Sequence, residues 1–294
     1  MDFRGVDLHG EDLSDLPLAR LLAGDLMEFG PKTDAQSEAE TIHLEGANLF
    51  TAHLEGANLY EVHLEGGDLT LAHLAGAHLA EGFFDRKTKL AGAILGNKTY
   101  GFISVVDISW GGVNLAILDW NSVSKLGDER KARQSKQLDD YQKAVRANRQ
   151  LAVALRNQGL SEEADHFAYR AQLLQRTVWR MQSRLLKFLF SWFLYLLAGY
   201  GYRPLRSILM YLLVIAAFAI GYYEVTHLLH AQPYPLAWYE ALILSVSSFH
   251  GRGFFQPVQS LGDPVAILAS IEAVFGLLIE ISFIATFTQR FFGK

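Results

Sequence analysis

The chain has 294 residues, of which 50% are hydrophobic and 19% are charged, whereas soluble domains carry about 25% charged residues. The absence of Cys excludes a disulfide scaffold, a Cys-ligated zinc site and a thiol nucleophile. The apolar content excludes intrinsic disorder. We expect no cleavable signal peptide, because residues 1–10 are acidic and mixed and contain no apolar core.

The charge is distributed unevenly along the chain. Residues 1–120 contain 7 Lys and Arg against 19 Asp and Glu, which is a net charge of −12. Residues 121–206 contain 16 against 7, a net charge of +9, and residues 207–294 contain 3 against 5, a net charge of −2. We therefore expect an acidic, a basic and a nearly uncharged part, each of a different structural kind.

The acidic part is a five-residue repeat built on His-Leu-Glu-Gly and Ala-Asn-Leu. A large apolar residue returns nine times without a slip, at Leu44, Leu49, Leu54, Leu59, Leu64, Leu69, Leu74, Leu79 and Phe84. A small residue stands two positions before most of them. Weaker runs lie at Phe3, Leu8, Leu13 and Leu18, and at Leu115 and Trp120 after an irregular stretch at 85–112.

A period of five fits neither a helix nor a flat strand, so the chain must turn at every fifth residue and point its large residues inward. The repeat resembles the pentapeptide-repeat family, whose pattern is A-[DN]-L-x-x. The resemblance implies a right-handed quadrilateral β-helix with four units per coil. The nine units then make about two coils stacked about 4.8 Å apart, and the flanking runs add about two more.

Histidines precede the inward leucines and therefore face outward, at His43, His53, His63, His73 and His78. With four units per coil, His43 lies beside His63 on one face and His53 beside His73 on the opposite face. Metal ligation and a solvated surface ladder are the two interpretations. We favour the ladder, for the glutamates Glu45, Glu55 and Glu65 as well, because a repeating sequence duplicates residues without selecting them for ligation. We predict no metal, no cofactor and no catalysis in the rod, and we expect a structural or docking element.

The basic part is predicted to be a helical hairpin. The first helix spans 128–157 with Tyr141, Val145, Ala152 and Leu155 on one side, and Gly159 suits its C-cap. Ser161 starts a second helix that runs to about 187 and has acidic residues in its first turn. Its inward residues are Phe167, Leu174, Val178, Met181 and Leu185. The hairpin resembles one tetratricopeptide-like unit.

The Lys and Arg residues of this part admit three interpretations. A nucleic-acid-binding surface requires a basic domain with aromatic side chains on which bases can stack, and the neighbouring acidic part argues against this interpretation. A solvated helix surface is the second interpretation. We favour the third, a cytoplasmic membrane flank, because the charge lies just before an apolar segment.

The last third contains two predicted membrane spans. Residues 207–223 carry no charge and 225–229 can extend them, and residues 265–289 are interrupted only by Glu272 and Glu280. Basic residues flank both outer ends, which predicts cytoplasmic N- and C-termini for a multi-pass protein of the cell (inner) membrane. Residues 185–198 are apolar but short and contain Lys187, which favours a helix lying at the membrane surface.

Between the spans lies a short apolar helix at 238–249, followed by a Gly-rich loop. Irregular backbone at membrane depth must line a protein-walled, wet cavity, which predicts a re-entrant pore loop that one subunit cannot close alone. The segment resembles the pore of two-transmembrane, potassium-channel-like ion channels, whose pattern is A-L-x-x-S-x-x-T-x-T-T-V-G-Y-G-D. The matching residues are Ala241, Leu242, Ser245, Val246, Ser248, Phe249, Gly253 and Phe254. With the repeats, the chain is similar to bacterial pentapeptide-repeat proteins that carry a C-terminal ion-channel domain, and this resemblance implies a homotetramer.

The predicted filter departs from that pattern. It comprises Ser248, Phe249, His250, Gly251, Arg252, Gly253, Phe254 and Phe255. His250 and Gly251 replace two Thr, Arg252 replaces Val, and Phe255 replaces the second Gly, a position where a side chain cannot adopt positive φ cheaply. Arg252 faces the pore or pairs behind the filter with Glu240 or Glu272, and we favour the pairing. We therefore expect weak K⁺ selectivity.

Charges inside a spanning helix are functional candidates. We predict that Glu272 braces the pore loop. For Glu280, lining the cavity and structural pairing remain equally open, and Gly276 is either a hinge or one of the glycines common in spanning helices.

The predicted domains are a cytoplasmic repeat domain at 1–120, a cytoplasmic helical hairpin or linker at 121–184, an interfacial helix at 185–204 and a pore domain at 205–294. We expect a tetrameric channel for monovalent cations in the lipid bilayer, with an unknown cytoplasmic partner for the repeats and no nucleic acid. The alternative is a non-conducting membrane scaffold or receptor whose rod recruits a partner. An enzyme is a remote third, because no catalytic motif is present.

Overall fold

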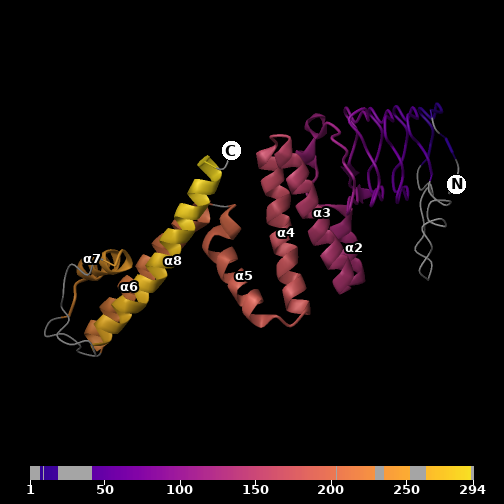
Figure 1. The fold of residues 1–294 in the computed structure, drawn as a ribbon. Helices are drawn as coiled ribbons and strands as arrows, with labels where there is room; N and C mark the ends of the chain where they lie inside the picture. Colours follow the sequence, from indigo (N-terminus) through magenta and orange to yellow (C-terminus); the bar gives the residue numbers. More distant parts are fainter. Residues whose placement is uncertain are drawn as a thin grey trace. The chain divides into compact units, whose positions relative to one another are not determined.

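The computed structural model describes residues 7–8, 10–18, 42–202, 204–228, 235–251 and 263–292. It divides into two compact units, Met1–Leu185 and Leu186–Lys294, whose elements are labelled in Figure 1. The division falls at the start of the helix that the sequence predicts at the membrane surface.

The repeats form a parallel β-helix whose coil contains four five-residue units. Parallel bridges join residues twenty positions apart, namely His43–His63, Asn48–Asp68, His53–His73 and Asn58–His78. The N–H of Leu44 donates to the His63 carbonyl across 2.9 Å, which ties one coil to the next. The predicted four-unit coil is confirmed, as is the placement of His43 beside His63 and of His53 beside His73.

Local backbone conformation explains the period of five. A residue with positive φ stands at every fifth position, for example at Gly46, Thr51, Gly56 and Glu61. Each of these residues turns the chain, and the inward residue returns after every turn. Because the left-handed conformation is strained for residues with a Cβ, the fold tolerates strain at every second corner and places glycine at the others.

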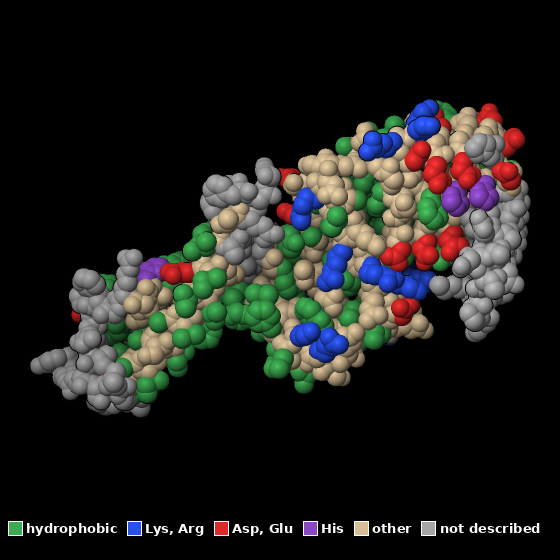
Figure 2. All heavy atoms as spheres, viewed as in Figure 1, with side chains coloured by type: hydrophobic (Ala, Val, Ile, Leu, Met, Phe, Trp, Pro, Cys, Tyr) green, Lys and Arg blue, Asp and Glu red, His purple; other side chains and the backbone are tan. Residues whose placement is uncertain are grey.

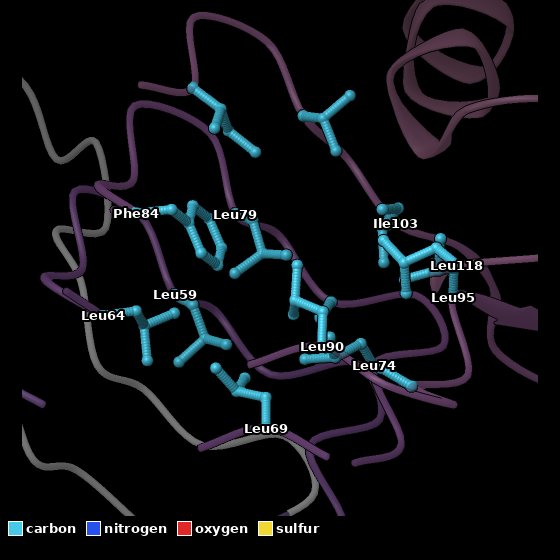
Figure 3. Packing of buried hydrophobic residues seen from close by; sticks show 14 of the residues in the cluster. Leu59, Leu64, Leu69, Leu74, Leu79, Phe84, Leu90, Leu95, Ile103 and Leu118 are labelled. Atoms are coloured by element: carbon cyan, nitrogen blue, oxygen red, sulfur yellow. The ribbon is translucent and has the colours of Figure 1, made fainter. Parts of the chain in front are cut away.

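The inward residues form one continuous apolar column (Figure 3). The inward leucines, which recur every five residues from Leu44 to Leu79, are at most 2% exposed, and Ala47, Ala52 and Ala57 are fully buried. At Gly67, a Cβ would lie 3.2 Å from the Leu64 carbonyl oxygen, so only a small residue fits there. The predicted large and small inward positions are therefore confirmed.

The weaker N-terminal run forms a further turn of the β-helix. Bridges join Asp7 to His43, Asp12 to Asn48 and Pro17 to His53, and Leu18 is 6% exposed. The offset is 36 residues instead of 20, so an insertion separates this coil from the next. Phe3 lies outside the described residues.

The stretch at 85–112 also forms turns of the β-helix, and its interpretation as irregular was wrong. Bridges continue from Asp68 to Lys89, at an offset of 21, and from His78 to Ser104, at an offset of 26. One extra residue near Asp85 causes the first shift, and a hairpin of β1 (Gly96–Asn97) and β2 (Gly101–Phe102) causes the second. Asp85 Oδ1 stabilises the first insertion by accepting hydrogen bonds from the N–H groups of Gly66 (2.8 Å) and Thr88 (2.9 Å).

Helices follow the coil. Two short 3-10 helices, η1 (Leu115–Ile117) and η2 (Trp120–Ser122), precede α2 (Gly127–Ser135), α3 (Leu138–Asn157) and α4 (Ser161–Met181). The predicted single helix at 128–157 is wrong, because Lys136 adopts φ +54° and separates α2 from α3. The predicted end near 187 is also wrong, because α4 ends at Met181.

The inward residues of the hairpin are partly as predicted. Phe167, Leu174 and Val178 are buried, whereas Met181 and Leu185 are 38% and 67% exposed. Val145, Ala152 and Leu155 are buried, and Tyr141 is partly buried against the same helices.

The hairpin covers the end of the β-helix and shares its core. Leu151, Leu155 and Phe167 pack in one cluster with Leu115 and Trp120, and the Trp120 and Phe167 rings meet edge to face at 5.9 Å. Polar contacts reinforce this cap. Glu129, fully buried on α2, forms a bidentate ion pair with Arg170 on α4. The β-helix and hairpin therefore form one unit.

The C-terminal unit contains α5 (Leu185–Ala198), η3 (Gly199–Gly201), α6 (Pro204–Leu228), α7 (Trp238–Phe249) and α8 (Pro264–Phe292). The bounds of α5 match the predicted surface helix. Two segments, Leu205–Leu228 and Pro264–Ile284, are long and apolar enough to cross a membrane, by length and composition. Apolar side chains cover much of the visible surface of this unit (Figure 2).

Candidate functional site

The candidate site is built where α7 packs between α6 and α8. Tyr222, Ala241, Leu244 and Val265 form one buried cluster near the N-terminal half of α7, and Phe249 belongs to a second cluster at its C-terminal end. The 12 residues of α7 span about 18 Å at 1.5 Å per residue, which is little more than half of a bilayer core of about 30 Å. Glu240 stabilises the start of this short helix, because its Oε2 accepts the Ala237 N–H at 2.8 Å.

Glu272 joins the three helices. Its side chain is fully buried, and Oε2 accepts a hydrogen bond from Tyr222 Oη of α6 at 2.7 Å. Its Oε1 lies 2.5 Å from Ser245 Oγ of α7, and the same hydroxyl lies 2.9 Å from the Ile215 carbonyl of α6. A buried carboxyl needs such donors, so this group fixes α7 against both long helices.

Gly276 allows the end of α7 to approach α8. A Cβ at Gly276 would lie 1.9 Å from the Phe249 carbonyl oxygen and 2.8 Å from the Phe249 carbonyl carbon. No side chain fits in that space without moving the α7 backbone. Close packing therefore explains this glycine without a hinge.

His250 and Gly251 end α7. Gly251 has φ +64°, and its N–H donates to the Ser248 carbonyl at 2.9 Å. His250 Nδ1 lies 2.7 Å from Glu280 Oε1 of α8, and its ring stacks on Tyr211 of α6 with centroids 6.0 Å apart. The side chains of His250 and Glu280 are 37% and 42% exposed, so this pair is accessible, unlike the Glu272 group.

The structure brings eight predicted site residues into this region. Ser248 and Phe249 are buried at the end of α7, beside the contacts described for His250, Gly251, Glu240, Glu272, Gly276 and Glu280. Arg252, Gly253, Phe254 and Phe255 lie outside the described residues, so the orientation of Arg252 stays a prediction.

Sequence reasoning missed Tyr222 and Tyr211, and it used Ser245 only as part of a motif. A signal was present for two of them, since a glutamate buried in an apolar helix requires hydroxyl or amide donors on the facing helices. Tyr222 and Ser245 supply such hydroxyls, but choosing them requires the rotation of each helix.

Comparison with known proteins gives matches for solved structures only. No protein-family model matches the chain, and no curated protein matches it. Pentapeptide-repeat proteins are among the solved structures to which it is similar. Rfr23 from the cyanobacterium Cyanothece 51142 is 23% identical with a TM-score of 0.21, over 36% of this chain and 64% of that one. This chain therefore spans less than two thirds of Rfr23.

Two further structures are of the same kind. A pentapeptide-repeat protein from the Arabidopsis thaliana thylakoid lumen is 25% identical with a TM-score of 0.21, over 42% of this chain and 80% of that one. HetL from Nostoc sp. strain PCC 7120, involved in heterocyst differentiation regulation, is 22% identical with a TM-score of 0.18, over 37% of this chain and 48% of that one.

Proposed function

We propose that the chain is one subunit of a homotetrameric membrane ion channel whose cytoplasmic β-helix has a regulatory or scaffold role. The observation that carries the proposal is α7, a half-length apolar helix held between two helices of spanning length by the buried Glu272 group. A half-helix that ends at membrane depth requires a wet cavity for the backbone that follows it. The described part of one chain supplies one such segment, so symmetry copies must close the cavity.

The surfaces of α6 and α8 support this arrangement. Leu209 and Ile220 of α6 are both 64% exposed, and Val274 of α8 is 60% exposed. Large apolar side chains that are exposed in a single chain require lipid or another subunit around them. In the proposed tetramer, one face of each long helix contacts neighbouring subunits and the remainder contacts lipid.

The helix α5 is proposed to lie at the cytoplasmic membrane surface. Leu186, Phe190 and Trp192 are 85%, 63% and 50% exposed, whereas Ser191 is buried. An apolar face with Trp at its edge fits the boundary between headgroups and acyl chains. This placement keeps the β-helix and both termini in the cytoplasm of the proposed inner-membrane protein, where an unidentified partner can reach the repeats.

The proposed permeating ions are monovalent cations with poor discrimination between K⁺ and Na⁺. Selective K⁺ filters use stacked rings of backbone carbonyls, and Phe255 replaces the second glycine that such a filter needs. A permeability ratio for K⁺ over Na⁺ above about 100 would contradict this part of the proposal.

Planar-bilayer recording of the purified full-length chain tests the function, and native mass spectrometry in detergent tests the assembly. We expect unitary cation currents and a tetramer. The matched control is a Glu272→Leu preparation, which removes the brace of α7 and should lose the currents. A tetramer that passes no current under voltage, pH, Ca²⁺ or tension would favour the non-conducting scaffold, and a monomer or dimer would refute the closed cavity.

A further inference from the structure

Two ladders of histidine and glutamate run along the outside of the β-helix, on opposite faces. In the first, His53 and His73 stand on successive coils with ring centroids 4.5 Å apart. Glu55 Oε1 lies 3.2 Å from Nδ1 of both rings. One carboxylate oxygen therefore faces two imidazole nitrogens, and the Glu55 side chain is only 12% exposed.

The second ladder has the same chemistry with one more carboxylate. Glu45 Oε1 lies 2.8 Å from His43 Nδ1 and 3.9 Å from His63 Nδ1, and Glu65 Oε1 lies 3.2 Å from His63 Nδ1. Among the described residues, the second oxygens of Glu45 and Glu65 are buried and have no hydrogen-bond partner. Buried polar atoms without a partner are unfavourable. The oxygens that face the histidines are the Oε1 atoms, and these are the ones placed to bind a cation.

The spacing of these atoms suits a transition metal. Ligands at 2.0–2.1 Å around a tetrahedral Zn²⁺ lie about 3.3–3.4 Å from one another. The donor atoms of His53, Glu55 and His73 all lie within 4.8 Å of each other, as do those of Glu45, His63 and Glu65. Imidazole nitrogen favours Zn²⁺ and its neighbours, whereas Mg²⁺ and Ca²⁺ prefer oxygen ligands alone.

We propose that each ladder binds one divalent transition-metal cation, with Zn²⁺ as the best fit, so that a chain binds two. Each histidine ligates through neutral Nδ1, and a proton held on that atom moves to Nε2 or to solvent. The protein ligands are His53, Glu55 and His73 in the first ladder and Glu45, His63 and Glu65 in the second, and each set leaves one position for water. Each metal joins two successive coils. Figure 2 shows histidine and acidic side chains adjoining on one visible face of the β-helix.

The structure favours metal ligation by these histidines over a solvated surface ladder. The sequence alone favoured a surface ladder of outward histidines, because residue spacing does not show whether the ring nitrogens converge on one point. The shared Glu55 oxygen and the convergence of donor atoms from Glu45, His63 and Glu65 are properties of the folded β-helix, and they favour ligation.

The test is Zn²⁺ titration of the full-length chain by calorimetry, after chelator treatment and with a purification tag that contains no histidine. Excess Mg²⁺ is present to occupy sites made of oxygen alone. We expect about two Zn²⁺ per chain. His73→Gln should remove the first site and His63→Gln the second, so each variant should bind about one Zn²⁺ per chain. The double variant should retain only binding that is at least tenfold weaker than that of the wild type.

The matched control is His166→Gln, which changes an exposed histidine on α4 and should retain two sites. If a histidine variant does not fold, Glu55→Gln and Glu65→Gln test the same ladders from the carboxylate side. Wild-type protein that binds no Zn²⁺, or a stoichiometry that the ladder variants leave unchanged, would overturn the proposal.

Discussion

Ser245 on α7 and Glu272 on α8 meet at 2.5 Å in the interior of the C-terminal unit, and both side chains are fully buried. Their contact is the buried polar link between the half-length helix and the second long helix, whereas the His250–Glu280 contact at the end of α7 is exposed. Ser245→Ala removes the donor to Glu272 Oε1, and a buried acceptor without a donor costs about 1–3 kcal/mol. We expect the free energy of unfolding in detergent to fall by about that amount.

The control for this prediction is Ser247→Ala on the same helix. Within the described residues, the Ser247 hydroxyl donates to the Leu244 carbonyl of its own helix, at 2.9 Å, so its loss should leave the unfolding free energy nearly unchanged. Equal effects of the two substitutions would show that Ser245 does not brace α7.

Gly276→Ala should displace the end of α7. The added Cβ would lie 1.9 Å from the Phe249 carbonyl oxygen, and backbone atoms cannot yield as the end of a flexible side chain can. We expect loss of thermal stability together with loss of the proposed current. Gly221→Ala on α6 is the matched control, because its Cβ would meet only Leu268 Cδ2, at 3.3 Å. A stable, conducting Gly276→Ala protein would contradict the close packing of α7.

The inward residues of the repeat were predictable because local spacing sets them, and the β-helix itself was implied by the resemblance to the pentapeptide-repeat family. Each inward leucine of the repeat between Leu44 and Leu79 depends only on a turn within its own five residues. The same reasoning failed at 85–112, where a one-residue insertion near Asp85 and the β1–β2 hairpin shift the count while the coil continues. A strict period detects units in register, but it does not detect units that an insertion has moved out of register.

The candidate site was predictable to a smaller extent. Glu272 was recognisable as a candidate site residue, because burying a carboxyl group in an apolar helix is energetically unfavourable and such residues are usually functional. Its partners were not, since Tyr222 lies 50 positions away and Ser245 lies 27 positions away, and their approach depends on how three helices pack. The break at Lys136 was equally hidden, because lysine gives no local signal for positive φ.

Asp128 and His78 should make opposite contributions to the pH dependence of stability. Burial raises the pKa of Asp128 to about 6, although the Val105 N–H, which donates to its Oδ2 at 2.8 Å, opposes this. The folded state then binds more protons than the unfolded state between about pH 4 and 6, so stability falls as pH rises through that window. At 1.36 kcal/mol per pKa unit the effect is about 3 kcal/mol.

His78 acts in the other direction. Burial, with help from the positive charge of Lys131, lowers the pKa of His78 to about 4. Between about pH 4 and 6.5 the unfolded state binds the extra proton, so stability rises with pH. The two contributions offset one another in the wild type.

Thermal denaturation at several pH values separates these contributions. Asp128→Asn should give a protein whose stability rises from pH 4 to 6.5, and His78→Gln one whose stability falls from pH 4 to 6. The same slope in both variants would show that these two groups do not control the pH response. Arg156→Gln, a change in an exposed ion pair with Asp165, should leave the wild-type profile unchanged.

Arg252 and Glu272 should act independently. The sequence favoured a pair between Arg252 and either Glu240 or Glu272, but both Glu272 oxygens already have hydroxyl partners in Tyr222 and Ser245. Glu240 Oε2 accepts from the start of α7. We therefore expect Arg252→Ala and Glu272→Gln to lower thermal stability additively in a double-mutant cycle. A double variant no worse than either single variant would establish the pair.

Replacing Glu280 should change the conductance of the proposed channel more than it changes the stability of the protein. Its contact with His250 is 37–42% exposed, and exposed pairs contribute about 0–1 kcal/mol. Glu280→Gln should therefore melt close to the wild type. If the carboxylate faces the conduit, four copies attract cations, and their removal should lower unitary cation conductance at low salt.

The salt dependence decides between the two roles of Glu280. Attraction by exposed charges is screened within about 10 Å at 0.1 M salt and about 3 Å at 1 M. The difference in conductance between wild type and Glu280→Gln should therefore be large in dilute salt and nearly vanish at 1 M. His250→Gln provides the matched control, because it breaks the same contact but keeps the carboxylate and should retain most of the low-salt conductance. Equal losses in the two variants, at both salt concentrations, would assign Glu280 to structural pairing instead of to the conduit.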